Sequence, residues 1–367
     1  MKVAIVHEWL TIYGGSERVT EIFHEIFPKA PIYCLVYDKD TMPERFKNYD
    51  IRTTFVQKLP FAKKHYKDYL PLMPRAFEEL DLTEYDLVIS SSSACAKGVI
   101  TRSDAIHICY CHTPTRYFWE FYYEYVKNMG KLKKTIISMF IHKLRMWDRL
   151  AADRVDKFIA NSNYIAGRIT KYYRRESKVI FPPVNTHLYN ISDKDENYYL
   201  IVSRLVTYKR IDLAVEAFNG MGLPLVVIGD GPQRNELEKI AKPNVKFLGR
   251  LSDEEIREYY STCKAFIFPG EEDFGITPVE CQASGRPVIA YGRGGALDTV
   301  LDGKTGMFFK EQSVESLIEA IEKFEKHGVE YTKEQIKEYS EKFSVDRFKK
   351  EFKDYINETI RFHSSEK

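Results

Sequence analysis

The fold is decided by one stretch, Phe266-Ile267-Phe268-Pro269-Gly270-Glu271-Glu272-Asp273-Phe274-Gly275-Ile276-Thr277-Pro278-Val279-Glu280. Its apolar start predicts a buried strand, and its end, from Thr277 onward, predicts the first turn of a helix. In α/β proteins, ligands bind at the carboxyl ends of strands, where a helix N-terminus offers unpaired N–H groups and positive partial charge. The stretch therefore predicts an anion site, and phosphate is an anion that such a site can hold.

The two carboxylates Glu272 and Glu280 each have a competing structural interpretation. Thr277 is predicted to cap the helix, with Pro278 at its first position, so Glu280 is placed to close a capping box. Glu272 lies in the loop, where a solvated surface carboxylate is the plain alternative. A glycosidase pair is a further interpretation, but spacing in the sequence does not give the separation that this chemistry requires.

Working outward, the apolar segments on both sides of this stretch predict further strands separated by helical segments. In the first half they are residues 2–7, 86–90, 105–110 and 157–160, and in the second half 198–203, 225–228, 245–250 and 287–291. Strands that alternate with helices are typical of parallel sheets in the α/β class. A chain of 367 residues is also long for one core, so we expect two domains, joined near the polar segment 193–197.

Polar and small residues follow several of these strands, where ligands of parallel sheets bind. Gly14-Gly15 follows the first strand and begins a helix, so its backbone N–H groups are available to an anion, although a tight turn is the alternative. His112 follows the strand 105–110. Arg204 and Lys209 follow the strand 198–203 and precede a helix, which suits a diphosphate as well as ordinary surface cations.

The composition, 44% hydrophobic and 29% charged, is that of a globular protein. No apolar run approaches the length of a membrane span, and the N-terminus has the pattern of a strand rather than a signal peptide, so we expect a cytoplasmic protein. The six cysteines lie mostly in apolar segments, as reduced core thiols do. The run Cys109-Tyr110-Cys111-His112 has no second ligand pair at zinc spacing, and we expect no metal there.

The net charge of +2 hides an asymmetry, since residues 1–185 carry 29 basic and 21 acidic side chains. Two basic segments of this half, 55–70 and 127–154, interleave cations with apolar residues. Such segments suit an anionic membrane surface as well as an ordinary surface helix. Nucleic acid is disfavoured because no recognised motif accompanies the charge. The turns at Gly229 and Gly292 lack the third glycine of a dinucleotide fingerprint, which disfavours an NAD-dependent dehydrogenase.

Taken together, these residues resemble the retaining glycosyltransferases of family four. The most specific element is the pair Glu272 and Glu280 within Glu-Asp-Phe-Gly-Ile-Thr-Pro-Val-Glu. Five other elements of the family's pattern are present in the order expected along the chain: Gly14-Gly15, His112, the segment from Ser203 to Lys209, Gly229-Asp230-Gly231 and Phe247-Leu248-Gly249-Arg250. The resemblance covers nearly the whole chain.

The resemblance implies the GT-B architecture, with two Rossmann-like domains whose parallel sheets face each other across a cleft. Residues 1–185 are expected to form the acceptor domain, with a C-terminal helix, about 345–367, packing back on it. Residues 186–344 are expected to form the nucleotide-sugar donor domain.

The resemblance also implies a role for each matching residue. Arg204 and Lys209 would hold the donor diphosphate, helped by the backbone of Gly14 and Gly15. Glu280 would accept hydrogen bonds from the ribose, and Glu272 would bind sugar hydroxyls. His112 would face the donor sugar, and other donor contacts are expected from Gly231, Arg250, and the backbone of Phe274, Gly275 and Ile276. Fixed cations and N–H groups stabilise the charge that develops on a departing nucleoside diphosphate, so no metal is expected.

The segment from Tyr110 to Trp119 looks like the branch of this family that adds mannose, or a related sugar, to lipid-linked oligosaccharides of bacterial surface polysaccharides. That branch commonly uses GDP-mannose. We therefore expect a mannosyltransferase that is peripheral on the inner face of the cell membrane. Two alternatives stay open: a transferase that uses a UDP-sugar, and a non-catalytic GT-B-like protein that binds a sugar nucleotide.

Overall fold

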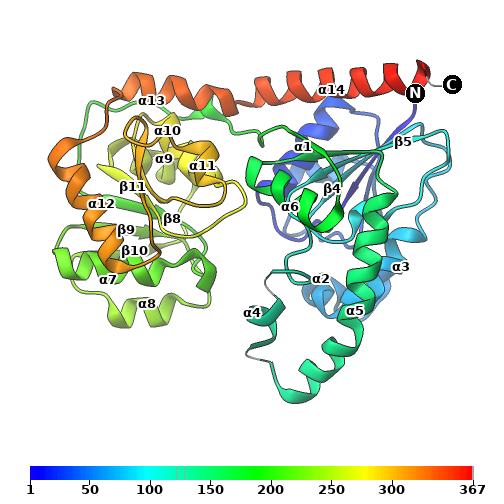
Figure 1. Ribbon diagram of the computed structural model, residues 1–367, viewed down its shortest axis with the longest axis horizontal. Coiled ribbons are helices and arrows are strands. Elements are labelled where there is room, and N and C mark those ends of the chain that lie inside the picture. Colours follow the sequence, from blue (N-terminus) through cyan, green and yellow to red (C-terminus); the bar gives the residue numbers. More distant parts are fainter. Residues whose placement is uncertain (121, 128, 366–367) are drawn as a thin grey trace. The chain divides into compact units, whose positions relative to one another are not determined.

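The computed structural model describes residues 1–120, 122–127 and 129–365, and its chain divides into two compact units (Figure 1). Unit 1 comprises Met1–Phe181 and Lys349–Lys367, and unit 2 comprises Pro182–Phe348. Each unit has one parallel sheet with helices on both faces. The predicted fold class, α/β with two Rossmann-like domains, is confirmed.

Unit 1 has seven strands in the order β3-β2-β1-β4-β5-β6-β7. They are β1 (Val3–His7), β2 (Ile32–Cys34), β3 (Ile51–Thr53), β4 (Leu87–Ser92), β5 (Ile106–Cys111), β6 (Lys157–Ala160) and β7 (Ser177–Val179). The helices are α1 (Gly15–Ile26), α2 (Ala62–His65), α3 (Met73–Glu78), α4 (Tyr122–Lys127), α5 (Lys131–Asp153), α6 (Asn163–Tyr173) and, across the unit boundary, α14 (Val345–Ser365). The three-residue strands β2, β3 and β7 were not predicted: β3 and β7 carry too few apolar residues to give a pattern, whereas β2 lies in an apolar run that was not assigned to a strand.

Residues that alternate along the strands of unit 1 face two different helical layers, as the pleat of a strand requires. Phe23 of α1 contacts the ring of Tyr110 edge-on and stacks on Phe352 of α14. Val6 and Val88, on the other face, belong to the cluster that contains Met73 and Phe77 of α3. The face under α1 is important below because His7 and Ser91 lie on it.

Unit 2 has six strands in the order β10-β9-β8-β11-β12-β13. They are β8 (Tyr199–Val202), β9 (Leu225–Ile228), β10 (Val245–Gly249), β11 (Ala265–Phe268), β12 (Val288–Tyr291) and β13 (Gly306–Phe309). The helices are α7 (Ile211–Met221), α8 (Arg234–Ile240), α9 (Asp253–Thr262), α10 (Ile276–Ala283), α11 (Ala296–Thr299), α12 (Val314–His327) and α13 (Lys333–Ser340).

The helices of unit 2 also form two layers. Helices α7, α8 and α12 cover one face of the sheet, and α9, α10 and α11 cover the other (Figure 1). Helix α12 shows why: its buried residues Leu317, Ala320, Ile321 and Phe324 recur at helical spacing and form one apolar stripe. Both loops of the predicted site leave the carboxyl edge of the sheet between these layers.

Candidate functional site

The two strands that precede the predicted donor residues lie side by side in unit 2. Strand β8 precedes Arg204 and Lys209, β11 precedes Glu272, and the two strands pair in parallel. They are also the pair at which the strand order reverses, since β9 and β10 extend to one side of β8, and β12 and β13 extend to the other side of β11. Ligands of open α/β sheets bind in the crevice at such a switch point.

Lys209 and Glu272 meet at this point. The Lys209 Nζ forms an ion pair with the Glu272 Oε1, and the two side chains keep 16% and 18% of their exposure. Lys209 ends a short 3₁₀ helix, Thr207–Lys209, before α7. The pair joins a cation and a carboxylate from two loops that are over sixty residues apart in sequence, and it remains accessible to a ligand.

Several contacts that the sequence did not reveal hold these two loops. Gln312 donates from Nε2 to the Pro269 carbonyl at 2.9 Å and accepts from Arg210 Nη1 at 3.3 Å, which links the loop after β11 to the loop after β8. The Gly295 N–H donates to the Glu272 carbonyl at 2.8 Å. A Cβ on Gly295 would lie 2.2 Å from the Phe274 Cα, so only glycine fits there. The glycine pair Gly294-Gly295 after β12 is the sequence signal from which this close packing against the loop after β11 could have been predicted.

The predicted start of helix α10 is wrong. The helix begins at Ile276, and Gly275, in the left-handed region at φ 90°, takes the N-cap position without a side-chain hydrogen bond. Thr277 is therefore the second helical residue and Glu280 the fifth, so they form no capping box. The backbone N–H groups of Gly275 and Ile276 have no acceptor among the described residues, which leaves the helix N-terminus available to an anion.

Glu280 points into the interior instead. Its Oε2 accepts a hydrogen bond from the Tyr260 hydroxyl at 3.2 Å, and the residue is buried. Burial, followed by the charge of Glu280, raises the pKa of Tyr260 well above its ordinary value, so Tyr260 remains a donor. The predicted ribose contact of Glu280 stays a prediction.

The structure places the remaining predicted residues of unit 2 at different points. Arg204 is exposed and its side chain has no hydrogen-bond or ion-pair partner among the described residues. Gly231 packs tightly, since a Cβ there would lie 2.3 Å from the Leu205 carbonyl oxygen. Arg250 is 85% exposed and lies 3.9 Å from Asp230, after the edge strand β10. Phe274 is buried with its ring 5.6 Å from that of Phe343.

In unit 1 the predicted glycines also follow a strand at a switch point, because the order reverses between β1 and β4. Gly14 takes the N-cap position of α1, and Gly15 begins the helix. The Gly14 N–H is already engaged, donating to the Glu17 Oε2 at 3.0 Å. Of the two amides predicted to hold a diphosphate, only that of Gly15 lacks an acceptor among the described residues.

His112 follows β5, and its ring contacts Ser91 of the neighbouring strand β4. The Ser91 Oγ lies 2.8 Å from the His112 Nε2, and Asn161 Nδ2 donates to the His112 carbonyl at 3.0 Å. Burial, with a smaller effect of His7, lowers the pKa of His112 to about 3. The ring is therefore neutral near pH 7.

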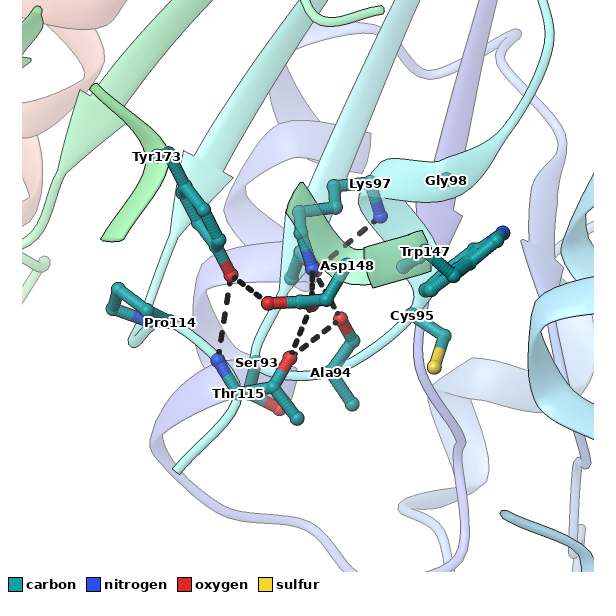
Figure 2. A network of polar contacts seen from close by, with 12 residues as sticks. Ser93, Ala94, Cys95, Lys97, Gly98, Pro114, Thr115, Trp147, Asp148 and Tyr173 are labelled. Carbon is teal, nitrogen blue, oxygen red and sulfur yellow. Dashed lines mark hydrogen bonds and ion pairs between the residues drawn. The ribbon is translucent and has the colours of Figure 1, made fainter. Parts of the chain in front are cut away.

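The loop after His112 is fixed by a buried polar network around Asp148 of α5, shown in Figure 2. Asp148 accepts hydrogen bonds from Lys97 Nζ at 2.5 Å, Thr115 Oγ1 at 2.8 Å, Trp119 Nε1 at 2.8 Å and Tyr173 OH at 3.0 Å. Burial alone would lower the pKa of Lys97, but the carboxylate of Asp148 raises it well above its ordinary value. A buried charge pair persists where its hydrogen-bonding capacity is filled.

Asp38 and Asp195 each lie in a sequence of two aspartates around a lysine, a pattern that can hold a metal, but both carboxylates are engaged in ion pairs. Asp195 pairs with Arg286 and Lys333, and Asp38 pairs with Lys63. The six cysteines are buried and free. Across residues 1–120, 122–127 and 129–365, no three His, Cys, Asp or Glu side chains gather in a metal-binding arrangement.

A cavity of about 480 Å³ in unit 2 lies away from the predicted residues. It is lined by the linker residues Asp195 and Asn197 and by Arg286, near the amino ends of β11 and β12. The charged side chains that line this cavity pair with one another. We therefore assign the candidate site to the carboxyl edge of the sheet instead.

Comparison with known proteins identifies the family and the fold of the chain. The family described as "Glycosyltransferase Family 4" matches residues 13–188, and that described as "Glycosyl transferases group 1" matches residues 189–343. The O-antigen chain mannosyltransferase C of Escherichia coli is 26% identical over 91% of each chain. A GDP-mannose-dependent alpha-mannosyltransferase of Corynebacterium glutamicum is 34% identical over 29% of this chain and 26% of its own.

The chain spans 49% to 63% of the length of three further curated relatives that it matches. Among solved structures, that of HepE from Anabaena with UDP and glucose has a TM-score of 0.72 at 17% identity, covering 97% of this chain and 99% of that one. The two family matches adjoin, and together they take in every strand of both sheets except β1, which precedes the first match. The chain thus belongs to the glycosyltransferases of family four, with the GT-B fold.

Proposed function

We propose that the protein transfers a hexose, mannose from GDP-mannose, to a lipid-linked or oligosaccharide acceptor in cell-surface polysaccharide synthesis, with retention of configuration. The observation that carries the proposal is the Lys209–Glu272 pair beside the open N-terminus of α10, at the switch point of unit 2. These groups join a cation, a carboxylate and backbone N–H donors, which suits a sugar diphosphate. The names of the two mannosyltransferase relatives support mannose as the sugar.

In this proposal Arg204 and Lys209 hold the diphosphate, together with the N–H groups of Phe274, Gly275 and Ile276. Glu272 accepts hydrogen bonds from sugar hydroxyls, and Glu280 accepts them from the ribose. The acceptor hydroxyl attacks the anomeric carbon from the face that the diphosphate leaves, and its proton passes to the leaving phosphate. The bond from the anomeric carbon to the phosphate oxygen breaks as the glycosidic bond forms, and fixed cations stabilise the charge on the diphosphate.

Isothermal titration with GDP and with UDP tests the donor. We expect GDP to bind more tightly and to raise the melting temperature more, because only a ligand of the folded state stabilises it. Tighter binding of UDP would replace mannose with a UDP-sugar as the donor. Absence of binding by every nucleotide and sugar nucleotide would overturn the proposal.

The acceptor side of the proposal includes an anionic membrane surface as partner of unit 1. Helix α5 begins at Lys131, and in its first half Leu132 and Met139 are 77% and 68% exposed beside the exposed cations Lys131, Lys134 and Lys143. The side chains of Lys133 and Ile136, and residue Asn128, lie outside the described part of the chain. Exposed apolar groups among cations suit the headgroup region of anionic lipid. Among the described helices, none combines the length and the hydropathy that a bilayer span requires.

A further inference from the structure

Five polar side chains form a continuous cluster under α1, at the carboxyl ends of β1, β4 and β5. His7 of β1 is buried, and its Nε2 lies 3.2 Å from the Glu17 Oε1. Its Nδ1 lies 2.9 Å from the Thr20 Oγ1 and 3.1 Å from the Ser91 Oγ. Ser91 in turn lies 2.8 Å from the His112 Nε2. The cluster therefore connects the glycine loop at Gly14 with His112.

The Glu17 end of the cluster decides where His7 carries its proton. The Glu17 carboxylate accepts from the Gly14 N–H at 3.0 Å and from the Ser16 hydroxyl at 3.0 Å. A carboxylate is an acceptor only, so the His7 Nε2 that faces it bears hydrogen. In neutral His7 the Nδ1 then carries no hydrogen and is a hydrogen-bond acceptor. A buried acceptor of this kind requires a hydrogen-bond donor.

The distances identify that donor as Thr20. The Thr20 Oγ1 also lies 3.0 Å from the Ser16 carbonyl oxygen and 3.1 Å from the Ser91 Oγ, both of which could accept its one hydrogen. Its contact with the neutral His7 Nδ1 is the shortest of the three, and at 2.9 Å two facing lone pairs would repel, so we place the Thr20 hydrogen between Thr20 and His7. The single hydrogen of Ser91 is then free to point at the His112 Nε2, 2.8 Å away. If His7 is an imidazolium, its Nδ1–H donates to Thr20 instead, and the Ser91 hydrogen still points at His112. Both states give His112 the same proton arrangement.

We propose that Ser91, held by His7 and Thr20, fixes neutral His112 as the tautomer that carries hydrogen on Nδ1, so that this nitrogen donates a hydrogen bond to a ligand oxygen and accepts no proton. The Nδ1 of His112 has no partner among the described residues, and the side chain is only partly buried. The identity of the oxygen, a sugar hydroxyl or a phosphate oxygen, rests on the proposed function. His7, Thr20 and Ser91 are positioning residues, since they act on the ligand only through His112.

The tautomer is measured directly on the ligand-free protein by ¹⁵N–¹H correlation of the histidine ring nitrogens at pH 8, with His112→Gln to assign the signals. We expect the His112 Nδ1 to be protonated and its Nε2 to be a lone pair. A protonated Nε2 in the wild-type protein would overturn the proposal without any variant having to fold.

Thr20→Val tests the coupling, because valine has the shape of threonine but no hydrogen to donate. When His7 is neutral, its Nδ1 must then take the Ser91 hydrogen, so we expect the proton of His112 to move to Nε2. Ser90→Ala is the matched control: Ser90 contacts the His107 Nε2 at 2.8 Å from the same two strands but on the opposite face of the sheet. It should leave His112 unchanged. If the same spectrum shows His7 to be neutral, an unchanged His112 signal in folded Thr20→Val would show that Thr20 does not set the tautomer. If it shows His7 to be an imidazolium, its Nδ1–H leaves the Ser91 hydrogen on His112, and an unchanged signal is the expected result.

The consequence for turnover separates this inference from the proposed function. In Thr20→Val the ligand oxygen would meet a lone pair in place of a donor, and we expect kcat/KM to fall about tenfold, or about 1.4 kcal/mol. Ser90→Ala should retain it. If no sugar nucleotide is turned over by the wild-type protein, the proposed function fails, and the spectra of the ligand-free protein still decide the tautomer. A shifted tautomer with unchanged kcat/KM would mean that the Nδ1–H meets no ligand.

Discussion

At the scale of residues, the Lys209–Glu272 pair is the feature on which the proposed chemistry depends most. An ion pair that retains some exposure contributes little to stability, because water and salt screen it. In the proposed function, its two members are therefore free to exchange partners when the diphosphate and the sugar of the donor bind. The pair places both charges at the switch point before the ligand binds, which reduces the cost of ordering them later.

We predict that Lys209→Ala and Glu272→Ala each reduce turnover of the true donor by about 100-fold or more, since loss of one preorganised contact to a developing charge costs that much. The melting temperature should change little. Lys264→Ala is the matched control, because Lys264 pairs with Glu325 at 2.5 Å but precedes β11 at the amino edge of the same sheet. Steady-state rates and thermal unfolding of the three variants provide the comparison. Unchanged turnover in both site variants would favour the non-catalytic alternative.

The same scale shows what a sequence can and cannot predict. Glu272 and Lys209 were predicted because they stand within local motifs that follow apolar strands. Ser91 was not, although it contacts both His7 and His112, because these partners lie on or after the neighbouring strands, and His7 is 84 residues away. Pairing of side chains across parallel strands depends on register, which becomes known only with the sheet. The roles of the predicted residues in binding stay predictions.

At the scale of elements, two helices with the same N-terminal signature behave differently. Ser252 with Glu255 predicts the start of α9, and the capping box is present, with the Ser252 N–H donating to Glu255 Oε2 at 2.8 Å. Thr277 with Glu280 has the same spacing, but α10 begins earlier, at Ile276. The difference is that α9 begins at the surface, whereas the loop before α10 packs against Gly294 and Gly295, which fixes its backbone. Tertiary packing overrides a local signal in this case.

This contrast yields a prediction for Gly275→Ala. The residue has φ 90°, which disfavours side chains, and its Cβ would lie 2.9 Å from the Phe268 ring. We expect the free energy of unfolding to fall by more than the roughly 1 kcal/mol that a strained backbone alone costs. We also expect weaker nucleotide binding, because the open N–H groups of α10 would shift.

Gly222→Ala is the control for backbone strain. Gly222 caps the C-terminus of α7 at φ 71°, and a Cβ added there would have no neighbour within 4 Å. The free energy of unfolding of this variant should fall by about 1 kcal/mol, and its affinity for the nucleotide should not change. Urea unfolding and isothermal titration measure the two effects. Equal affinities in the two variants would show that α10 does not contact the donor.

At the scale of the whole molecule, the two units repeat one topology but differ in charge. Both sheets reverse their strand order after the first strand of the unit, so each offers one switch point to a ligand. Residues 1–185 carry an excess of basic side chains, while the molecule as a whole has a net charge of only +2. A nearly neutral molecule is drawn to an anionic surface by a local patch rather than by its total charge.

The patch on α5 is therefore predicted to determine membrane binding. Reversal of Lys131, Lys134 and Lys143 to glutamate should reduce binding to vesicles that contain phosphatidylglycerol by about 100-fold, at about 1 kcal/mol for each cation near the surface. Binding should also weaken with salt, because the lysines are exposed. The same reversal of Lys239, Lys246 and Lys326, which are exposed on unit 2, changes the total charge equally and should leave binding intact. Co-sedimentation at low salt distinguishes the two sets, and equal losses would show that total charge, not the face of α5, attracts the protein.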